Sequence, residues 1–513
     1  MLKIIGISIG LFISSLLQAQ LTVTQSAEYR QLNPWLSGSN PAGLIFNPIR
    51  SFSTAEGQYR YTQGDFREVT TAPNIHTYLF GAESYRQLKK LQLYGHISYS
   101  TAYQQERQWS ATVQPENHLF RFGDSIAGRQ RCETYSLGGK IAIPLNSHWT
   151  IGGTLDYTTR SNSKNTDPRN KNIQTDLLFS PGVVFNTPLF HLGANLIYHR
   201  IIEKIDYSLV NDQTRDACTF YPLWFYRTED FQKGINNSRN YKEERYGGAL
   251  QAYFRKETFL WFNEFRYTRG TEILNIFPTQ DKKTGETRRK EFHYTGEIRL
   301  ENTLQHTITP SCSYLERTAF EYLQTRGGNN TVIYETYGQV KRAAILNWQT
   351  GLSYRIARKK ENLPYLWSFT THIGYHREKT LFFVYPLSLE QLTNRFCFGE
   401  KYERYFRIRK DLLCLTLKIN YITGHGTLPV PVSESSSPLP EVKLSQRQDL
   451  LLRDFRFLTA ESLTPELELR YIHPILEKYA LSFSAGARYT QALSPSCKQM
   501  NRQHYQLSAG FIF

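Results

Sequence analysis

Short runs in which apolar and polar residues alternate constrain this chain most strongly. The run 149–157 reads WTIGGTLDY, with apolar residues or glycine at the odd positions and mostly polar residues at the even ones. The same pattern recurs over residues 91–99, 190–198, 259–267, 367–375, 413–421 and 481–489. Side chains alternate across a strand with period two, so each run predicts a β-strand with one apolar face and one polar face.

Each of these runs ends on a tyrosine in the apolar phase. The tyrosines are Tyr99, Tyr157, Tyr198, Tyr267, Tyr375, Tyr421 and Tyr489. A run of this length spans roughly 26 Å along a strand, or about 20 Å once the strand tilts as in a membrane barrel. That length approaches the apolar band of an outer membrane, where aromatic residues gather at both edges. We therefore predict that the tyrosines form a girdle at the external interface.

Connections between the expected strands alternate in length. Short turns are expected near residues 89–90, 146–147, 188, 256–257, 302–303, 359–364, 409–411 and 473–477. Longer polar segments are expected at 104–131, 161–173, 204–240, 271–287, 318–342, 381–399, 424–463 and 491–502. Short periplasmic turns and long external loops are typical of outer-membrane barrels. The prediction is an all-β fold: a transmembrane antiparallel β-barrel over residues 51–513, with about eighteen strands (sixteen or fourteen are alternatives) and both termini periplasmic.

The last ten residues, HYQLSAGFIF, form an alternating stretch that ends on Phe511 and Phe513. This stretch resembles the closing strand of bacterial outer-membrane barrels. The resemblance implies that the barrel-assembly machinery recognises these two phenylalanines. We also expect the outer membrane and its lipopolysaccharide as partners, because a formal charge of +16 suits a surface that faces anionic lipopolysaccharide.

The amino terminus has the pattern of a secretory signal. Lys3 precedes an apolar run from Ile4 to Leu17, and Ala19 offers a small residue at a cleavage site. This pattern predicts a signal peptide over residues 1–19, cleaved near Ala19, and export to the outer membrane of a Gram-negative cell.

Residues 20–50 are expected to form a separate amino-terminal segment. Their Asn33-Pro34-Trp35 and Ser39–Leu44 motifs carry proline and glycine, which disfavour a central strand. The Asn-Pro-Ala-Gly-Leu run at 40–44 resembles the amino-terminal segment of long-chain fatty-acid transporters, and of related barrels of the Bacteroidetes. The resemblance implies a plug inside or beneath the barrel, with Trp35, Asn40 and Pro41 as candidate plug residues. A turn leading into the first strand is the alternative.

Composition agrees with a barrel that has a lipid face and a wet lumen. Tyr (34) and Phe (31) are abundant, yet charged residues make up 21% and the mean hydropathy is −0.49. The formal charge of +16 is scattered along the chain, without a basic helix or an aromatic RNA-binding signature, so we expect no nucleic-acid partner. Over most of its mature length, the chain resembles outer-membrane barrel proteins of the Bacteroidetes type.

Charged residues in the polar phase of the strands are candidates for lining the lumen. They are Arg60, Lys140, Asp156, Glu264, Arg266, Glu297, Arg299, Arg355, Lys418, Glu466, Glu468, Arg470 and Arg488. They could form an aqueous constriction that selects permeant solutes, or a ladder of ion pairs that fills the interior. The residues leave both alternatives open.

One expected external loop, 217–227, is unusually aromatic. It contains Phe220, Tyr221, Trp224, Phe225 and Tyr226. If these side chains are exposed, they mark a binding surface. The alternative is that the loop folds onto other loops above the membrane.

Motifs of catalysis and cofactor binding are missing from the sequence. A G-x-S-x-G pattern at Gly6–Gly10 falls inside the expected signal peptide, and the six cysteines are too widely separated for a metal knuckle. We therefore predict no enzyme activity, cofactor or metal. The expected function is gated, substrate-selective transport or binding of a small solute. The alternative is a non-transporting partner in uptake or secretion that docks another protein through its loops.

Overall fold

The computed structural model describes residues 33–212, 214–232, 237–276, 282–327, 333–360, 363–384, 387–429, 444–476 and 479–513. The signal peptide expected over 1–19 and the first part of the segment expected over 20–50 lie outside the described residues.

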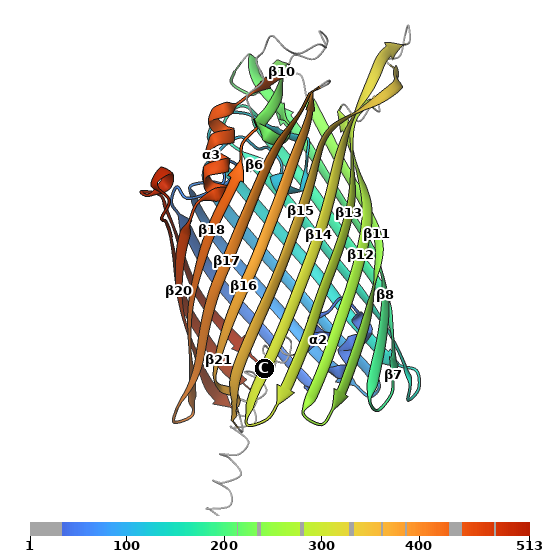
Figure 1. Ribbon diagram of the computed structural model, residues 1–513, viewed down its shortest axis with the longest axis vertical. Helices are drawn as coiled ribbons and strands as arrows, with labels where there is room; N and C mark the ends of the chain where they lie inside the picture. Colours follow the sequence, from blue (N-terminus) through green and yellow to red (C-terminus); the bar gives the residue numbers. More distant parts are fainter. Residues whose placement is uncertain are drawn as a thin grey trace, which may run out of the picture.

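Eighteen antiparallel strands form one closed barrel (Figure 1). Each strand pairs with the next along the barrel, and β1 closes the ring by pairing with β22. The strands are β1 (Ser51–Gln63), β2 (Asn74–Leu88), β3 (Leu91–Arg107), β5 (Gly128–Pro144), β6 (Trp149–Lys164), β7 (Arg169–Asn186), β8 (Phe190–Ser208), β11 (Asn237–Lys256), β12 (Phe259–Ile276), β13 (Lys282–Glu301), β14 (Leu304–Gly327), β15 (Ile333–Lys360), β16 (Leu363–Val384), β17 (Leu387–Ile408), β18 (Asp411–Thr427), β20 (Ser462–Leu476), β21 (Tyr479–Ala492) and β22 (Asn501–Ile512). The predicted fold class and the count of about eighteen strands are confirmed.

Alternation along the strands separates two environments. In β6, Leu155 and Tyr157 are 56% and 42% exposed on the outer surface, and Asp156 between them faces the opposite side. Exposed leucine, isoleucine and aromatic side chains cover the outside of many strands in the same way. Such an apolar exterior around a polar interior suits a barrel solvated by lipid. No helix in the described part of the chain is long and apolar enough to cross a membrane.

The two ends of the barrel differ. The connections 89–90, 145–148, 187–189, 257–258, 302–303 and 409–410 are short and lie at the end where β1 begins and β22 finishes. We call this end the short-turn end and the opposite one the long-loop end.

Several segments expected as external loops are mostly strand in their described residues. β15 alone is 28 residues long, and residues 271–287, 318–342 and 381–399 mostly extend strands beyond the apolar band. Polar cross-strand contacts hold these extensions, including Lys379 to Glu390 (2.8 Å) and Gln324 to Thr336 (3.0 Å). Their apolar residues, such as Leu274, Phe382 and Leu389, face inward to the cap rather than outward to lipid, so the alternation of a membrane strand is missing.

A folded cap covers the long-loop end. It contains a four-stranded sheet in the order β19 (Ser445–Gln446), β10 (Phe225–Gln232), β9 (Thr214–Phe220) and β4 (Arg121–Gly123). The helix α3 (Gln448–Thr459) and the short turns η2 (Pro115–Asn117) and η3 (Pro222–Trp224) complete it, and η6 (Pro495–Cys497) lies in the connection between β21 and β22. Figure 1 shows α3 and β10 at the upper rim of the barrel.

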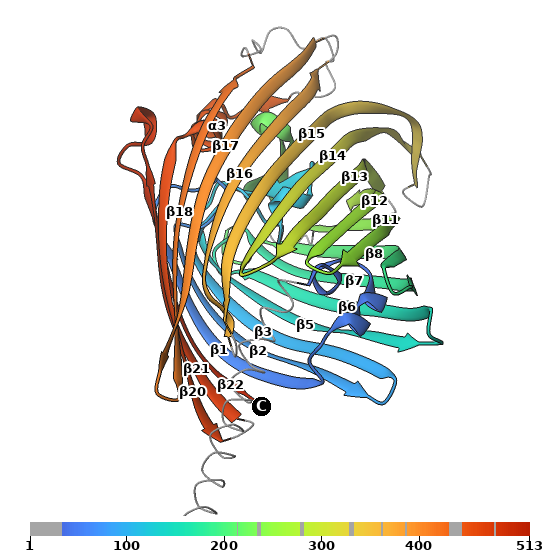
Figure 2. The same cartoon turned by 60° about the horizontal axis from the view of Figure 1, so that its bottom comes forward.

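The described chain begins inside the barrel. The helix α2 (Pro34–Ser37) and the 3₁₀ turn η1 (Pro41–Phe46) precede β1. Figure 2, which brings the short-turn end forward, shows these two elements in blue within the ring of strands. Residues 33–48 are called the docked segment below.

Candidate functional site

Two asparagines start the helical turns of the docked segment. The side-chain oxygens of Asn33 and Asn40 each accept a hydrogen bond from the N–H two residues later, at 3.1 and 3.0 Å. Pro34 and Pro41 follow them at the first helical position, where a missing N–H costs nothing. The Asn33 amide also donates to the Phe46 carbonyl (3.0 Å), which ties the two turns together.

The side chain of Asn40 attaches the docked segment to the barrel wall. Its amide lies 3.1 Å from the Val183 carbonyl on β7, 3.2 Å from the Ala194 carbonyl on β8 and 2.9 Å from Gln251 Oε1 on β11. The residue is 2% exposed. Asn40 therefore contacts three neighbouring strands with one side chain.

Ser39 contacts the fourth strand of this set. Its N–H and hydroxyl both donate to the Glu264 carboxylate on β12, at 2.9 and 3.0 Å. Gln251 donates to the same carboxylate at 3.1 Å and to Asn195 at 2.9 Å. Glu264, predicted to line the lumen, thus accepts hydrogen bonds from neutral donors on both the segment and the wall.

Glycines in the wall make room for this contact. A Cβ placed on Gly182 would lie 2.3 Å from the Asn40 side-chain oxygen, and one on Gly152 would lie 2.5 Å from the Ala42 nitrogen. On Gly193 it would lie 2.8 Å from Asn40 Nδ2. Only glycine permits so close an approach of the segment to the strands.

An aromatic cluster holds the other side of the segment. The Trp35 ring packs against Phe46 (5.0 Å between centroids), Phe262 (5.6 Å, edge-on) and Tyr253 (6.3 Å). Trp35 is 2% exposed, so the ring is removed from water by the wall of the barrel. Of the candidate plug residues, Trp35, Asn40 and Pro41 all lie in this buried interface.

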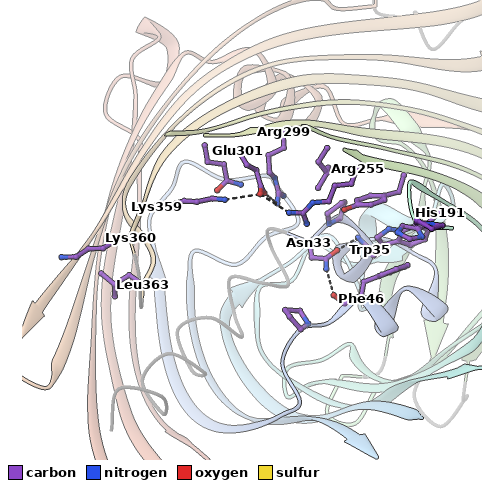
Figure 3. Close-up of a pocket in the computed structure, with 16 residues that line it drawn as sticks. Asn33, Trp35, Phe46, His191, Arg255, Arg299, Glu301, Lys359, Lys360 and Leu363 are labelled. Carbon is purple, nitrogen blue, oxygen red and sulfur yellow. Dashed lines mark hydrogen bonds and ion pairs between the residues drawn. The ribbon is translucent and has the colours of Figure 1, made fainter. Parts of the chain in front are cut away.

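A cavity of about 670 Å³ lies beside the docked segment at the short-turn end (Figure 3). The segment supplies Asn33, Trp35 and Phe46 to its lining. The wall supplies His191, Tyr253, Arg255, Leu260, Arg299, Glu301, Lys359 and Leu363, among others. The cavity is therefore bounded by two parts of the chain that meet only through the fold.

Six of the remaining charged residues predicted to line the lumen form ion pairs with one another. Three pairs come together: Glu466 with Arg488 (2.7 Å), Glu468 with Arg470 (3.3 Å), and Glu297 with Arg299. Lys418 stands opposite Glu466 in the register of β18 and β20, and the Arg355 guanidinium lies 4.4 Å from the Tyr365 ring centroid. Arg60, Lys140, Asp156 and Arg266 occupy inward positions of β1, β5, β6 and β12. Ion pairs thus line part of the lumen.

The aromatic residues expected in an external loop are part of the cap and are not an exposed surface. Phe220, Tyr221, Trp224 and Phe225 are between 1% and 4% exposed, and Tyr226 packs against the same cluster. The Phe225 ring stacks on Phe382 of β16 at 4.3 Å. The loop folds onto other loops and onto strand ends because the strands that project past the apolar band offer it an apolar inner face.

Asp454 and Trp224 join α3 to the rest of the cap. The Trp224 indole N–H donates to the Asp454 carboxylate at 2.7 Å, and the Val69 N–H donates to it at 2.9 Å. Burial raises the pKa of the Asp454 carboxyl above its usual range. The contact therefore brings together three segments that are far apart in the sequence.

A buried histidine that the sequence did not single out connects the cap to the barrel wall. His118 Nδ1 lies 2.6 Å from Glu272 on β12, and Nε2 lies 3.3 Å from Glu203 on β8. Burial acts to lower the pKa of His118, but the two carboxylates outweigh it and raise the pKa to about 10. His118 is therefore a buried cation between two carboxylates. No local sequence motif indicates that His118 takes this role.

The seven predicted girdle tyrosines lie on the outward face of their strands. Tyr157, Tyr267 and Tyr489 are between 40% and 49% exposed. Tyr99, Tyr198 and Tyr375 have ring contacts with the exposed Tyr135, Tyr246 and Phe396, and Tyr421 pairs with the exposed Phe398.

The end of the chain takes part in closing the barrel. The backbones of Phe513 and Ser53 exchange two hydrogen bonds of 2.7 and 2.9 Å. Phe511 and Phe513 are 36% and 50% exposed, and Phe511 stacks on Tyr479 at 5.6 Å. Strand closure therefore depends on residues up to the last position.

The sequence profile of a family described as "Family of unknown function (DUF6850)" matches residues 41–513. The chain belongs to the DUF6850 family. No curated protein sequence matches it.

The DUF6850 barrel resembles solved outer-membrane transporters and channels at low identity. The outer membrane transporter YddB from Escherichia coli is 9% identical with a TM-score of 0.41, covering 90% of this chain and 81% of that one. BauA, the ferric preacinetobactin receptor from Acinetobacter baumannii, is 9% identical with a TM-score of 0.36, covering 90% and 80%. A deletion mutant of the TodX monoaromatic hydrocarbon channel is 11% identical with a TM-score of 0.31, covering 93% of each chain.

The described part of the DUF6850 barrel contains no cluster of metal-ligating side chains. Within the described ranges, no group of three or more His, Cys, Asp or Glu side chains is arranged to hold a metal ion. Cys132, Cys397 and Cys497 are free thiols.

Proposed function

We propose that this protein is an outer-membrane barrel that passes or binds a small solute, with residues 33–48 acting as a gate at the short-turn end. The docking of Ser39 and Asn40 against β7, β8, β11 and β12 carries this proposal. An eighteen-stranded barrel is wide enough for a water-filled lumen unless something occupies it. The docked segment lies within that lumen.

The chemistry of the docking supports a gate that can open. Its polar contacts with the wall are hydrogen bonds, each contributing a net of about 0.5–1.5 kcal/mol, or about 1.5–3 kcal/mol where the charged Glu264 accepts. Water can replace such bonds when the segment leaves the wall. Trp35, Ala42 and Leu44 supply apolar contacts in two clusters that include wall residues, and these contacts add to the stability of the docked state.

The apolar exterior and the closing strand support the location in the outer membrane. An outward apolar face requires a lipid environment, and the terminal Phe511 and Phe513 lie on the outside of that wall. We further propose that the barrel-assembly machinery reads this strand. Enzyme activity is no part of the proposal.

Planar-bilayer conductance tests the gate. The mature protein is compared with a variant lacking residues 20–48 and with a matched control lacking only residues 20–32, which keeps the docked segment. We expect little conductance from the mature protein and the control, and stable open channels from the longer deletion.

Two outcomes would contradict the gate. A large steady conductance from the intact protein would indicate a general porin without a gate. Absence of conductance in all three proteins would favour a non-transporting partner that docks another protein through its loops. The folded cap over the long-loop end is suited to that role.

A further inference from the structure

The cavity beside the docked segment carries more positive than negative charge. Arg255, Arg299, Lys359 and Lys360 line it, and Glu301 is the one carboxylate among the described residues of its lining. Four cations against one carboxylate leave an excess of three positive charges. Arg299 also pairs with Glu297, which lies outside the lining, and counting that carboxylate leaves an excess of two.

A single carboxylate is shared among three of these cations. Glu301 lies 3.3 Å from Arg255, 3.2 Å from Lys359 and 3.6 Å from Arg299 (Figure 3). Even with Glu297 counted, two negative charges do not neutralise these three positive ones, so the group attracts a further anion. The Arg299 and Glu301 side chains are 9% and 17% exposed, whereas those of Arg255 and Lys359 are 54% and 45% exposed, so water screens the first two charges less than the last two.

An apolar and aromatic part of the lining lies beside these charges, since Leu260 pairs with Arg255 and Arg299 in the strand register. Trp35 and Phe46 come from the docked segment, and Tyr253 and Leu260 come from the wall. The His191 ring stacks on Tyr253 (5.2 Å) and lies 4.8 Å from Phe46. Such a surface suits a flat or aliphatic body rather than a fully hydrated ion.

Two polar atoms in the lining are buried without a hydrogen-bond partner among the described residues. They are Trp35 Nε1 and His191 Nδ1. Both atoms are closed even to water-sized molecules, so neither contacts a ligand in the cavity, and recognition of a ligand depends on the charges and the apolar part of the lining.

We propose that this cavity binds a small organic anion, such as a carboxylate or sulfonate, with an aromatic or aliphatic body. The acid group lies toward Arg255 and Lys359, and the body lies against Trp35 and Tyr253. The cavity volume of about 670 Å³ falls in the range of small-molecule sites. This inference rests on the proposed function, because the docked segment forms one side of the site.

The position of the site couples the ligand to the gate. Only the docked state presents Trp35 and Phe46 to the ligand, so a bound anion stabilises that state by mass action. Saturating ligand therefore lowers channel opening in any variant whose segment is partly released.

Calorimetric titration of the full mature protein in phosphatidylcholine nanodiscs tests the site. The probes are naphthalene-2-sulfonate, the neutral 2-naphthol and the cationic 2-naphthylmethylammonium. We expect the sulfonate to bind with an affinity that falls with salt, the naphthol to bind at least about tenfold more weakly, and the cation not to bind.

Variants locate the binding. Arg255→Gln and Lys359→Gln should each weaken sulfonate binding about tenfold, and Trp35→Phe should weaken it several-fold while keeping an aromatic ring in place. Lys410→Gln is the matched control, because Lys410 is a cation of a short turn at the same end and lies outside the cavity lining. Heat-modifiable gel migration shows that each variant is folded.

Each contrary result has a distinct meaning. Equal affinity for sulfonate and naphthol would overturn charge recognition, and equal binding by Arg255→Gln, Lys359→Gln and Lys410→Gln would overturn the location. Open channels in the 20–48 deletion together with no probe binding to the intact protein would keep the gate and overturn this site. Probe binding to the intact protein, together with no conductance from the variant lacking residues 20–48, would keep the site and overturn the gate.

Discussion

Ser39 and Glu264 are 225 positions apart in the chain, yet the Glu264 carboxylate accepts two hydrogen bonds from Ser39, at 2.9 and 3.0 Å. Glu264 is 5% exposed on the inner face of β12. A carboxylate in such a place needs several donors to offset its loss of hydration. The docked segment supplies two of them, so the charge on the wall and the position of the segment depend on each other.

Replacing Glu264 with alanine should therefore release the segment. The change removes the acceptor of both Ser39 donors, and hydrogen bonds to charged groups contribute about 1.5–3 kcal/mol each. We expect the undocked state to become at least about a hundredfold more populated, seen as more frequent channel openings in planar bilayers. Glu468→Ala is the matched control, since Glu468 is a lumen carboxylate that pairs with Arg470 rather than with the segment. Equal opening rates in the two variants would argue against a gate held by Glu264.

The wall glycines provide a steric test of the same interface. In Gly182→Ala the new methyl would lie 2.3 Å from Asn40 Oδ1 and 3.0 Å from the Pro41 ring, so the segment must shift. In Gly486→Ala, on the inner face of β21, the nearest atom would be 3.6 Å away, which is ordinary contact. We expect limited proteolysis to cut residues 33–48 faster in Gly182→Ala than in the wild type or in Gly486→Ala. Equal protection in all three proteins would contradict the close docking.

The barrel itself was predictable because lipid imposes a simple rule on every strand. Residues facing outward must be apolar across the membrane, so runs such as 149–157 repeat with period two and end on an aromatic residue. The strand extensions beyond the membrane obey no such rule. Their outer face is largely polar and their inner face packs against the cap, so the sequence in these regions lacks the alternation of a membrane strand.

The cap and its links to the wall could not be predicted from local patterns. His118 contacts Glu203 and Glu272, which are 85 and 154 positions away in the chain. No sequence pattern near any of these three residues indicates the other two. The helix α3 does carry a local signal. Leu451, Phe455 and Leu458 recur at helical spacing within a segment expected only as a long loop.

The closing strand offers a test of the membrane face with adjacent residues. Leu507 is 58% exposed on the outside in the middle of β22, and Ser508 faces inward and bonds to Ser484 at 2.8 Å. Lysine at a lipid-facing midplane position costs about 2–4 kcal/mol. We therefore expect Leu507→Lys to reduce the heat-modifiable folded fraction strongly and Ser508→Lys to reduce it much less. The opposite order would show that the register of β22 is reversed.

The last prediction concerns the pH dependence of the cap. His118 is enclosed by Glu203 and Glu272, lies 4.2 Å from the Tyr241 ring and is near Glu243. Its pKa in the folded protein is about 10, above the ordinary value of 6.5. A folded-state pKa that is raised means that the stabilisation is fully present below about pH 6.5 and is lost as the pH rises through 10.

We expect the thermal unfolding midpoint of the wild type in detergent micelles to fall between pH 6.5 and pH 10. Deprotonation of His118 over this interval removes the positive charge that offsets the two carboxylates. The loss should amount to a few kcal/mol, since each unit of pKa shift corresponds to about 1.4 kcal/mol. In His118→Gln the side chain stays neutral at every pH, so the midpoint should be lower at pH 6.5 and change less over this interval. His148→Gln, a change at an exposed histidine of the short-turn end, should keep the wild-type profile. If His118→Gln and the wild type lost stability in parallel from pH 6.5 to pH 10, the link between cap and wall would depend on some group other than His118.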